Sequence, residues 1–190
     1  YASFTVPPNT PLLQFTLRGG SGDSDLIVTG PDGRLFISPR EGNNETLSVV
    51  NPIAGLWDIE VFGYESFAGV SLKAALVKPA VLAPNTTLSN LTGVVGSETF
   101  YRVAVPSGAT AFAVTTSGGT GDVDIYVRRN LPASCQAVLA AFGYAPCLPD
   151  SSSAKDGNEE SISVTNPQAG DWYIDVTGFD DYAGVVLEVR

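Results

Sequence analysis

The sequence runs Gly-Gly-Ser-Gly-Asp-Ser-Asp-Leu-Ile-Val at residues 19–28, and the pattern returns at residues 118–127 as Gly-Gly-Thr-Gly-Asp-Val-Asp-Ile-Tyr-Val. Clustered glycines mark a turn whose backbone adopts positive φ. The apolar run that follows each cluster predicts a β-strand. Because the block occurs twice, we predict two copies of one structural unit.

A second shared block supports this repeat. It runs Asn-Pro-x-Ala-Gly-x-Trp at residues 51–57 and again at residues 166–172. Asp23 corresponds to Asp122, 99 residues on, whereas Trp57 corresponds to Trp172, 115 residues on. The second copy therefore carries 16 additional residues between the two blocks, and both cysteines lie in that region.

Apolar residues alternate with polar ones along several short segments, as in Phe15 and Leu17 or Trp57 and Ile59. No segment sustains a 3.6-residue period, so we expect few helices. Short strands separated by Gly, Pro and Asn turns predict an all-β chain of two tandem antiparallel β-sandwich domains. The tryptophans fall in phase with aliphatic residues, which predicts core positions.

The domain boundary is predicted at a short linker with proline near both ends, residues 78–84. The first domain is then 1–77, and the second is 78–190 with a cysteine-containing insertion. The second domain opens with an apolar element at residues 88–91 that the first lacks. We therefore expect the given sequence to begin inside its first domain.

Composition restricts the function. The 190 residues are 44% hydrophobic and 16% charged, with a net charge of −10 and no histidine. An acidic surface disfavours nucleic acid and anionic membranes as partners. The sequence shows no apolar run long enough for a membrane span. Absence of histidine excludes a Ser-His-Asp triad and imidazole metal ligands. We expect no catalytic residues, so the chain is not predicted to be an enzyme.

Cys135 and Cys147 bracket a short loop. In a glycine-rich β chain of low charge they favour one disulfide and an oxidising, extracellular compartment. The alternative is two free thiols.

The repeated Asp-x-Asp pairs, Asp23 with Asp25 and Asp122 with Asp124, are candidate ligands of calcium. Alternate residues of a strand share one face, so both carboxylates of a pair are available to one cation that prefers oxygen ligands. In the alternative interpretation, one aspartate of each pair accepts backbone hydrogen bonds from the glycine turn and the other is solvated.

Two loops offer aromatic side chains at matching positions: Tyr64 and Phe67 in the first copy, and Phe179 and Tyr182 in the second. Exposed aromatic rings stack on sugar rings or hold a peptide. The alternative is that at least one ring in each loop folds inward over the sandwich. The acidic pairs in the second copy, Glu159 with Glu160 and Asp180 with Asp181, are expected at the solvated surface.

These blocks, in this order and repeated twice, resemble the bacterial pre-peptidase C-terminal domain. The resemblance rests on residues 19–28, the Gly-Asn-Asn-Glu-Thr run at residues 42–46, the Trp57 and Trp172 blocks and the loops that follow them. It implies a jelly-roll-like β-sandwich attached to secreted hydrolases, often proteases, and often removed during maturation. Related domains of bacterial collagenases bind calcium and collagen. Family members commonly carry a cysteine pair at the place of Cys135 and Cys147.

We therefore expect non-catalytic modules of a secreted bacterial hydrolase, attached to its catalytic domain and binding an insoluble polymer such as collagen or polysaccharide. Two weakly binding modules in series gain from raised effective concentration. The alternative is a secretion, maturation or spacer role, and a cell-surface adhesive repeat is a third class.

Overall fold

The computed structural model describes residues 1–134, 138–140, 143–145 and 149–190. These residues form strands, turns and loops. None of the described segments is a helix long and apolar enough to cross a membrane. The all-β prediction is confirmed. The chain divides into two compact units: unit 1 comprises residues 1–78 together with residues 134, 138–140 and 143–145, and unit 2 comprises residues 79–133 and 149–190. Cys135 and Cys147, and with them the disulfide prediction, lie outside the described residues.

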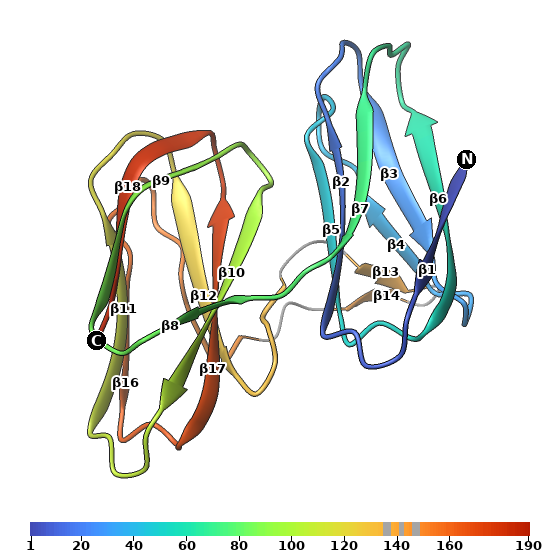
Figure 1. Ribbon diagram of the computed structural model, residues 1–190. Coiled ribbons are helices and arrows are strands. Elements are labelled where there is room, and N and C mark those ends of the chain that lie inside the picture. Colours follow the sequence, from blue (N-terminus) through green and yellow to red (C-terminus); the bar gives the residue numbers. More distant parts are fainter. Residues whose placement is uncertain (135–137, 141–142, 146–148) are drawn as a thin grey trace. The chain divides into compact units, whose positions relative to one another are not determined.

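Unit 1 is a two-layer sandwich of seven strands (Figure 1). One sheet has the order β1-β6-β3-β4 and the other the order β5-β2-β7. Every pair within these sheets is antiparallel. The strand bounds are Ala2–Val6 (β1), Leu12–Arg18 (β2), Ser24–Thr29 (β3), Leu35–Ser38 (β4), Glu45–Val50 (β5), Gly55–Gly63 (β6) and Ser71–Leu76 (β7).

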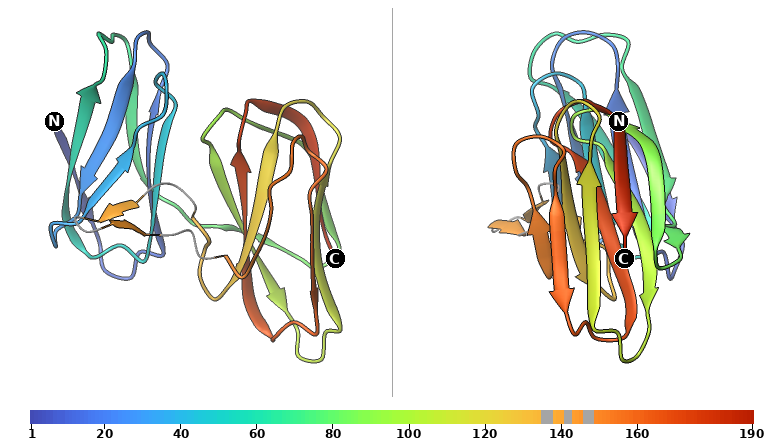
Figure 2. Two further views of the ribbon diagram at one scale, coloured as in Figure 1. Left: turned by 180° about the vertical axis from the view of Figure 1, so that it is seen from behind. Right: turned by 90° about the vertical axis from the view of Figure 1, so that its left-hand side faces the viewer.

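Unit 2 repeats this plan and adds a strand to each sheet (Figure 2). Its sheets have the orders β15-β12-β17-β10-β8 and β16-β11-β18-β9. The hairpin of β13 and β14 lies between β12 and β15 in sequence but groups with unit 1. The bounds are Ala80–Leu82 (β8), Thr86–Gly93 (β9), Glu98–Val105 (β10), Ala111–Ser117 (β11), Val123–Arg129 (β12), Val138–Ala140 (β13), Gly143–Ala145 (β14), Ser151–Ser153 (β15), Ser161–Thr165 (β16), Gly170–Gly178 (β17) and Tyr182–Val189 (β18).

The predicted linker is in part a strand. Residues 80–82 form β8, which pairs in parallel with β10 at the edge of a unit 2 sheet. Proline signals such as Pro79 and Pro84 mark where this strand starts and ends, because proline cannot continue a ladder of backbone donors. The sequence also assigned all of residues 78–190 to the second domain, whereas β13 and β14 group with unit 1.

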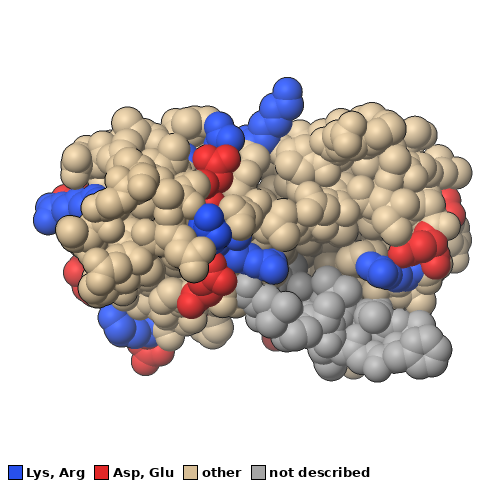
Figure 3. Space-filling view, turned by 90° about the horizontal axis from the view of Figure 1, so that it is seen from below, with Lys and Arg blue, Asp and Glu red and all other residues tan. Residues whose placement is uncertain are grey.

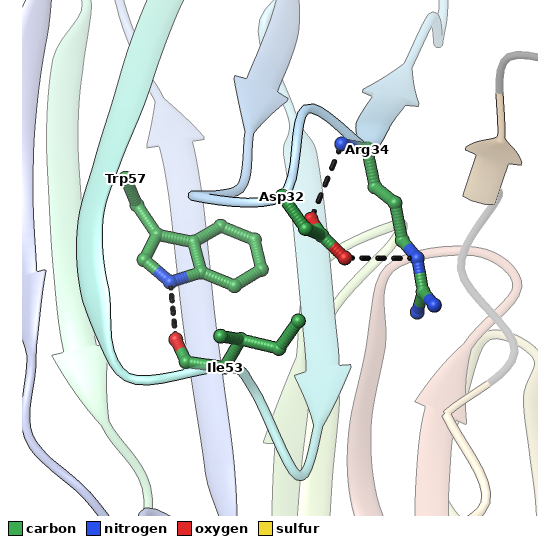
Figure 4. A network of polar contacts seen from close by, with 4 residues as sticks. All are labelled: Asp32, Arg34, Ile53 and Trp57. Carbon is green, nitrogen blue, oxygen red and sulfur yellow. Dashed lines mark hydrogen bonds and ion pairs between the residues drawn. The ribbon is translucent and has the colours of Figure 1, made fainter.

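Each unit is built around one tryptophan in its hydrophobic core. Trp57 lies 5.4 Å from Phe36 between ring centroids, and Trp172 lies 5.3 Å from Phe112. Burying an indole requires a partner for its N–H group. Trp57 Nε1 donates to the backbone oxygen of Ile53 at 3.0 Å (Figure 4), and Trp172 makes the same bond to the residue four positions before it at 2.9 Å.

The turn beside Trp57 is held by a short polar contact. Arg34 donates its backbone N–H to Asp32 Oδ1 at 3.2 Å, and its Nε lies 3.0 Å from Asp32 Oδ2 (Figure 4). This Pro-Asp-Gly turn leads from β3 into β4 and fixes the place of Phe36 against the indole. Core placement of both tryptophans agrees with the sequence prediction.

Candidate binding surface

The glycine block of each unit holds the aromatic loop that follows β6 or β17. Ser21 and Ala68 exchange two backbone hydrogen bonds of 2.9 and 3.0 Å. Thr120 and Ala183 make the matching exchange in unit 2, also at 2.9 and 3.0 Å. Both glycine blocks are therefore structural, because they let two stretches of backbone approach closely.

Glycine is required there for reasons of space as well as conformation. A Cβ atom at Gly22, where φ is +88°, would lie 2.0 Å from the backbone oxygen of Ser66. At Gly121, where φ is +92°, it would lie 2.0 Å from the backbone oxygen of Asp181. Any larger residue at either position must displace the aromatic loop.

The aspartates after the glycines also support this loop through their backbones. The backbone oxygen of Asp23 accepts the N–H of Glu65 at 3.1 Å. That of Asp122 accepts two N–H groups, from Phe179 at 3.0 Å and Asp180 at 3.2 Å. The strand, the glycine turn and the aromatic loop therefore form one connected substructure in each unit.

The two Asp-x-Asp pairs differ in how their side chains are used. Asp23 Oδ1 accepts at 3.2 Å the backbone N–H of Gly42, a residue of the loop between β4 and β5 and not of the glycine turn that precedes Asp23. Asp124 Oδ2 accepts the hydroxyl of Tyr126 at 3.2 Å. Asp122 Oδ1 is buried without a hydrogen-bond partner in the structure. Among the described residues, no group of three or more acidic, histidine or cysteine side chains is arranged to hold a metal ion.

Burial shifts the titration of these carboxyls. Burial first, and the negative charges of Asp122 and Glu160 next, raise the pKa of Asp124 to about 6, although the Tyr126 hydroxyl opposes the shift. Burial and the neighbouring Asp23 also raise the pKa of Asp25. A cation at either pair would relieve the repulsion between its two carboxylates.

The aromatic side chains lie in two different environments. In unit 1, Tyr64 is 72% exposed and Phe67 is 37% exposed. Phe62, the penultimate residue of β6, is exposed beside them in sequence. In unit 2 only Phe179 remains exposed, at 62%, because Tyr182 is 4% exposed and belongs to the core. Tyr182 is therefore not available for stacking on a ligand in this structure.

The end of β9 accounts for the burial of Tyr182. A Cβ atom at Gly93, the last residue of β9, would lie 2.4 Å from Tyr182 Cε1. Asp181 Oδ1 accepts the backbone N–H of Val95 at 2.8 Å, and Gly178 exchanges backbone hydrogen bonds with Gly96 and Ser97. The end of β9 and the turn after it therefore cover this loop in unit 2.

Two buried glutamates were not anticipated from the sequence. Glu160, expected at the solvated surface, is 1% exposed and accepts the backbone N–H of Lys155 at 3.0 Å. Glu45 holds the matching position in unit 1 and accepts the N–H of Arg40. Burial raises the pKa of Glu45 to about 7. The sequence does carry a signal for these buried glutamates, because a glutamate occurs at the same position of both repeats.

A second group of buried acids occurs in unit 2. Asp175 on β17 is fully buried, and Glu98 on β10 and Asp124 on β12 are also buried. Burial, followed by the nearby Glu98 carboxyl, raises the pKa of Asp175 well above its usual value. In unit 1 the position of Asp175 is taken by the partly exposed Glu60, whose carboxylate accepts the Tyr1 hydroxyl at 2.9 Å.

A polar groove of about 650 Å³ lies at another part of unit 2, beside the edge of Trp172. Arg129 lines it, but its guanidinium already donates to the backbone oxygen of Ala169 and to Gln168 Oε1. The arginine therefore fixes the turn before β17. On the face shown in Figure 3, basic side chains lie among acidic and uncharged ones instead of forming one patch.

Comparison with known proteins identifies the two repeats. The protein-family model described as "Bacterial pre-peptidase C-terminal domain" matches residues 1–63 and 97–178 of this chain. The chain belongs to the bacterial pre-peptidase C-terminal domain family. The family prediction from the sequence blocks is thus confirmed, and the matched segments contain both glycine blocks and both tryptophans.

Relatives of this pre-peptidase C-terminal domain chain include bacterial proteases. It is 30% identical over 107 residues to a neutral protease of Vibrio proteolyticus, covering 56% of this chain and 16% of that protein. It is 27% identical over 124 residues to a zinc metalloprotease of Helicobacter pylori, covering 64% of this chain and 44% of that protein. The chain thus spans less than half the length of these relatives.

Two solved structures are similar to part of the chain. The solution structure described as "vEP C-ter 100" is 35% identical with a TM-score of 0.42, covering 58% of this chain and 98% of that one. The pre-peptidase C-terminal domain of a collagenase from Bacillus anthracis is 15% identical with a TM-score of 0.41, covering 60% and 95%.

Proposed function

We propose that the two units are non-catalytic accessory modules of a secreted bacterial hydrolase, a protease, and that they bind an insoluble polymer of the collagen or polysaccharide class. The names of the relatives support the link to proteases, since the matched parts belong to a neutral protease and a zinc metalloprotease. The catalytic domain would then be part of the same polypeptide. An extracellular location follows from this role.

One observation carries the binding proposal: the exposed aromatic set of unit 1. Phe62, Tyr64 and Phe67 lie within six residues of one another and are all exposed. The glycine block fixes the backbone of their loop, so the rings are presented by an ordered segment. Aromatic rings bury a large area on a sugar or peptide at low cost in side-chain entropy. Phe179 offers a smaller contact in unit 2.

The test is co-sedimentation of the chain with fibrillar collagen, cellulose and chitin. The double variant Phe62→Ala, Tyr64→Ala should lower affinity for the bound polymer about tenfold or more, because each ring contributes about 1 kcal/mol or more. Leu56→Ala is the matched control, since Leu56 is equally an exposed apolar residue of β6 but lies at its other end.

Two results would overturn the proposal. If Leu56→Ala weakens binding as much as the aromatic double variant, the loss comes from the stability of β6 and not from the rings. If the unaltered chain sediments with none of the polymers, a spacer or maturation role replaces polymer binding.

Calcium is a further component of this proposal. Asp122 Oδ1 has no hydrogen-bond partner, and the charge of Asp122 is close enough to help raise the pKa of Asp124, so the pair suits a cation that prefers hard oxygen ligands. Asp23 fits less well because it already accepts the Gly42 N–H. Each pair supplies two carboxylates, so backbone and water oxygens would complete the coordination.

Calcium at 100 times its dissociation constant should stabilise unit 2 by about 2.7 kcal/mol. The double variant Asp122→Asn, Asp124→Asn should abolish this gain, and Asp32→Asn, which changes an aspartate of a unit 1 turn, should leave it intact. An unfolding midpoint that is unchanged by both calcium and chelator would contradict the proposal.

A further inference from the structure

Each unit contains one Asp-Gly dipeptide, Asp32-Gly33 in unit 1 and Asp156-Gly157 in unit 2. This pair of residues favours formation of a succinimide, because glycine has no side chain to hinder attack of its backbone nitrogen on the preceding carboxyl group. The ring closes only when both reacting groups can leave their present contacts. The surroundings of the two dipeptides therefore decide which of them reacts.

The dipeptide of unit 1 is held on both sides of the bond that would form. Gly33 donates its N–H to the backbone oxygen of Gly30 at 2.9 Å. The Asp32 carboxylate accepts the backbone N–H of Arg34 at 3.2 Å and lies 3.0 Å from Arg34 Nε (Figure 4). The attacking nitrogen and the carboxyl group are thus both engaged, and these contacts must open before the ring can close.

The dipeptide of unit 2 lies in the loop between β15 and β16 and is not held in this way. Asp156 is exposed, and its carboxylate makes no hydrogen bond or ion pair with any residue that the structure describes. Within the same described residues, the N–H of Gly157 has no acceptor. Neither reacting group of this dipeptide has a contact to lose.

The equivalent loop of unit 1 differs in the two features that matter. A shift of 115 residues relates Asp156-Gly157 to Glu41-Gly42. Gly42 donates its N–H to Asp23 Oδ1 at 3.2 Å, whereas Asp122 Oδ1, the matching atom of unit 2, is buried without a hydrogen-bond partner. Glutamate would also have to close a six-membered ring, which forms far less readily than a succinimide. Unit 1 therefore lacks this reactive site.

We propose that Asp156-Gly157 is a site of spontaneous modification, at which aspartate is converted to isoaspartate. The nitrogen of Gly157 attacks Cγ of Asp156, and one water leaves, made from the carboxyl hydroxyl and the amide proton. Hydrolysis of the succinimide at the backbone carbonyl of Asp156 returns one water. The chain then continues through Cγ with a free α-carboxylate, its mass is unchanged, and no oxidant, reductant or enzyme is needed.

The product would alter the support of the glycine block in unit 2. The backbone oxygen of Gly157 accepts the N–H of Val123 at 3.4 Å. Asn158 Nδ2 donates to the backbone oxygen of Gly118 at 3.0 Å, and Glu159 Oε1 accepts the Gly118 N–H at 2.9 Å. Isoaspartate lengthens the main chain by one methylene immediately before these residues, so their contacts with the glycine block must shift. Isomerisation should therefore destabilise unit 2 and leave unit 1 unchanged.

The test is to age the chain for several weeks in neutral buffer at a temperature where it stays folded. Isoaspartate is located by peptide mapping and quantified with a protein isoaspartate methyltransferase, which transfers a methyl group from S-adenosylmethionine to the new α-carboxylate. We expect about fivefold or more isoaspartate at Asp156 than at Asp32, because a hydrogen bond that must open contributes about 1 kcal/mol. Unfolding followed by Trp172 fluorescence should show the loss of stability.

Two variants connect the reaction to the structure. Asp156→Glu introduces the residue type that unit 1 has at this position, so it should abolish the modification there and keep unit 2 stable on ageing. Arg34→Ala removes the ion pair that holds Asp32, so it should raise isoaspartate at Asp32 about two- to fivefold. A synthetic peptide of residues 151–160 gives the rate without a folded loop.

Three results would overturn the proposal. The first is an equal level of isoaspartate at Asp32 and Asp156 in the unaltered chain, which would mean that the contacts of unit 1 give no protection. The second is an unmodified Asp156 after the peptide has isomerised in the same buffer. The third is an equal loss of unit 2 stability on ageing in the Asp156→Glu variant, which would assign that loss to another reaction.

Discussion

Unit 1 and unit 2 have the same sandwich fold but differ in which strands cover the edges of their sheets. Both have a glycine block bonded to an aromatic loop, and both bury one tryptophan whose N–H bonds to a turn. Unit 2 adds β8 and β9 to its sheet edges, and it buries Tyr182, Asp175 and Glu98. Among the described residues, the same framework has this sheet edge covered in unit 2, and in unit 1 the edge is uncovered and the aromatic rings are exposed.

The largest expected difference is at the paired aromatic positions. Tyr182→Ala should lower the free energy of unfolding of unit 2 by about 3–5 kcal/mol, because it removes a buried ring from the core. Phe67→Ala should cost unit 1 about 1 kcal/mol or less, because its ring is partly solvated. Urea unfolding followed by the indole N–H signals of Trp57 and Trp172 reports each unit separately. Equal losses in the two units would mean that Phe67 is covered as Tyr182 is.

Alanine substitutions in the glycine blocks should destabilise both units equally. The two units would then differ only in which strands cover their sheet edges. Gly22→Ala and Gly121→Ala should each destabilise their own unit by about 2–4 kcal/mol, through strain at positive φ and a clash with backbone oxygen. Gly19 and Gly118 also have positive φ but nothing within 4 Å of a Cβ atom. Alanine at these two control positions should cost about 1 kcal/mol. If the controls cost as much, conformation and not close approach explains the glycines.

A smaller difference should appear with pH. Because burial raises the pKa of Asp175 in the folded state, its contribution to stability is present below the unfolded pKa and is lost as pH rises through the folded pKa. Unit 2 should therefore become less stable from pH 4 to pH 8, and Asp124, with a pKa of about 6, adds in the same direction.

Asp175→Asn removes the charge from this site. It should stabilise unit 2 at pH 8 by about 1–3 kcal/mol, the penalty of an uncompensated buried polar group, and change little at pH 4. Glu60→Gln, at the matching and partly exposed position of unit 1, is the control and should change unit 1 by less than about 0.5 kcal/mol. A pH profile of unit 2 that keeps its slope in the Asp175→Asn variant would show that other groups cause it.

Local sequence patterns predicted the strands and turns better than they predicted which strand covers which sheet edge. The doubled glycine block, the Asn-Pro turns and the in-phase tryptophans were sufficient for the sandwich, the repeat and the core, since turn chemistry and alternation are local. The extra apolar element before residue 93 was visible as a difference between the repeats. That it lies along β18 and covers Tyr182 is a long-range pairing, which periodicity does not specify.

The candidate site was predicted unevenly for the same reason. Exposure of Tyr64 and Phe179 fits the expected aromatic loops, but the fate of the paired ring depends on whether a strand from elsewhere covers it. Likewise, Glu160 stands in a polar run and still turns inward to bond the loop at Lys155. Neighbouring residues alone do not distinguish a solvated carboxylate from one that caps a loop.

The central claim is that β9 covers β18 while no strand among the described residues covers the equivalent edge of β7, and amide hydrogen exchange of the chain of residues 1–190 tests it most directly. Every second amide of β7 points away from β2, so these amides should exchange at least about tenfold faster than the β18 amides that face β9. Measuring at several dilutions separates association from structure. Equal protection of β7 and β18 at the lowest chain concentration would contradict the account, because it would mean that the edge of unit 1 is already paired.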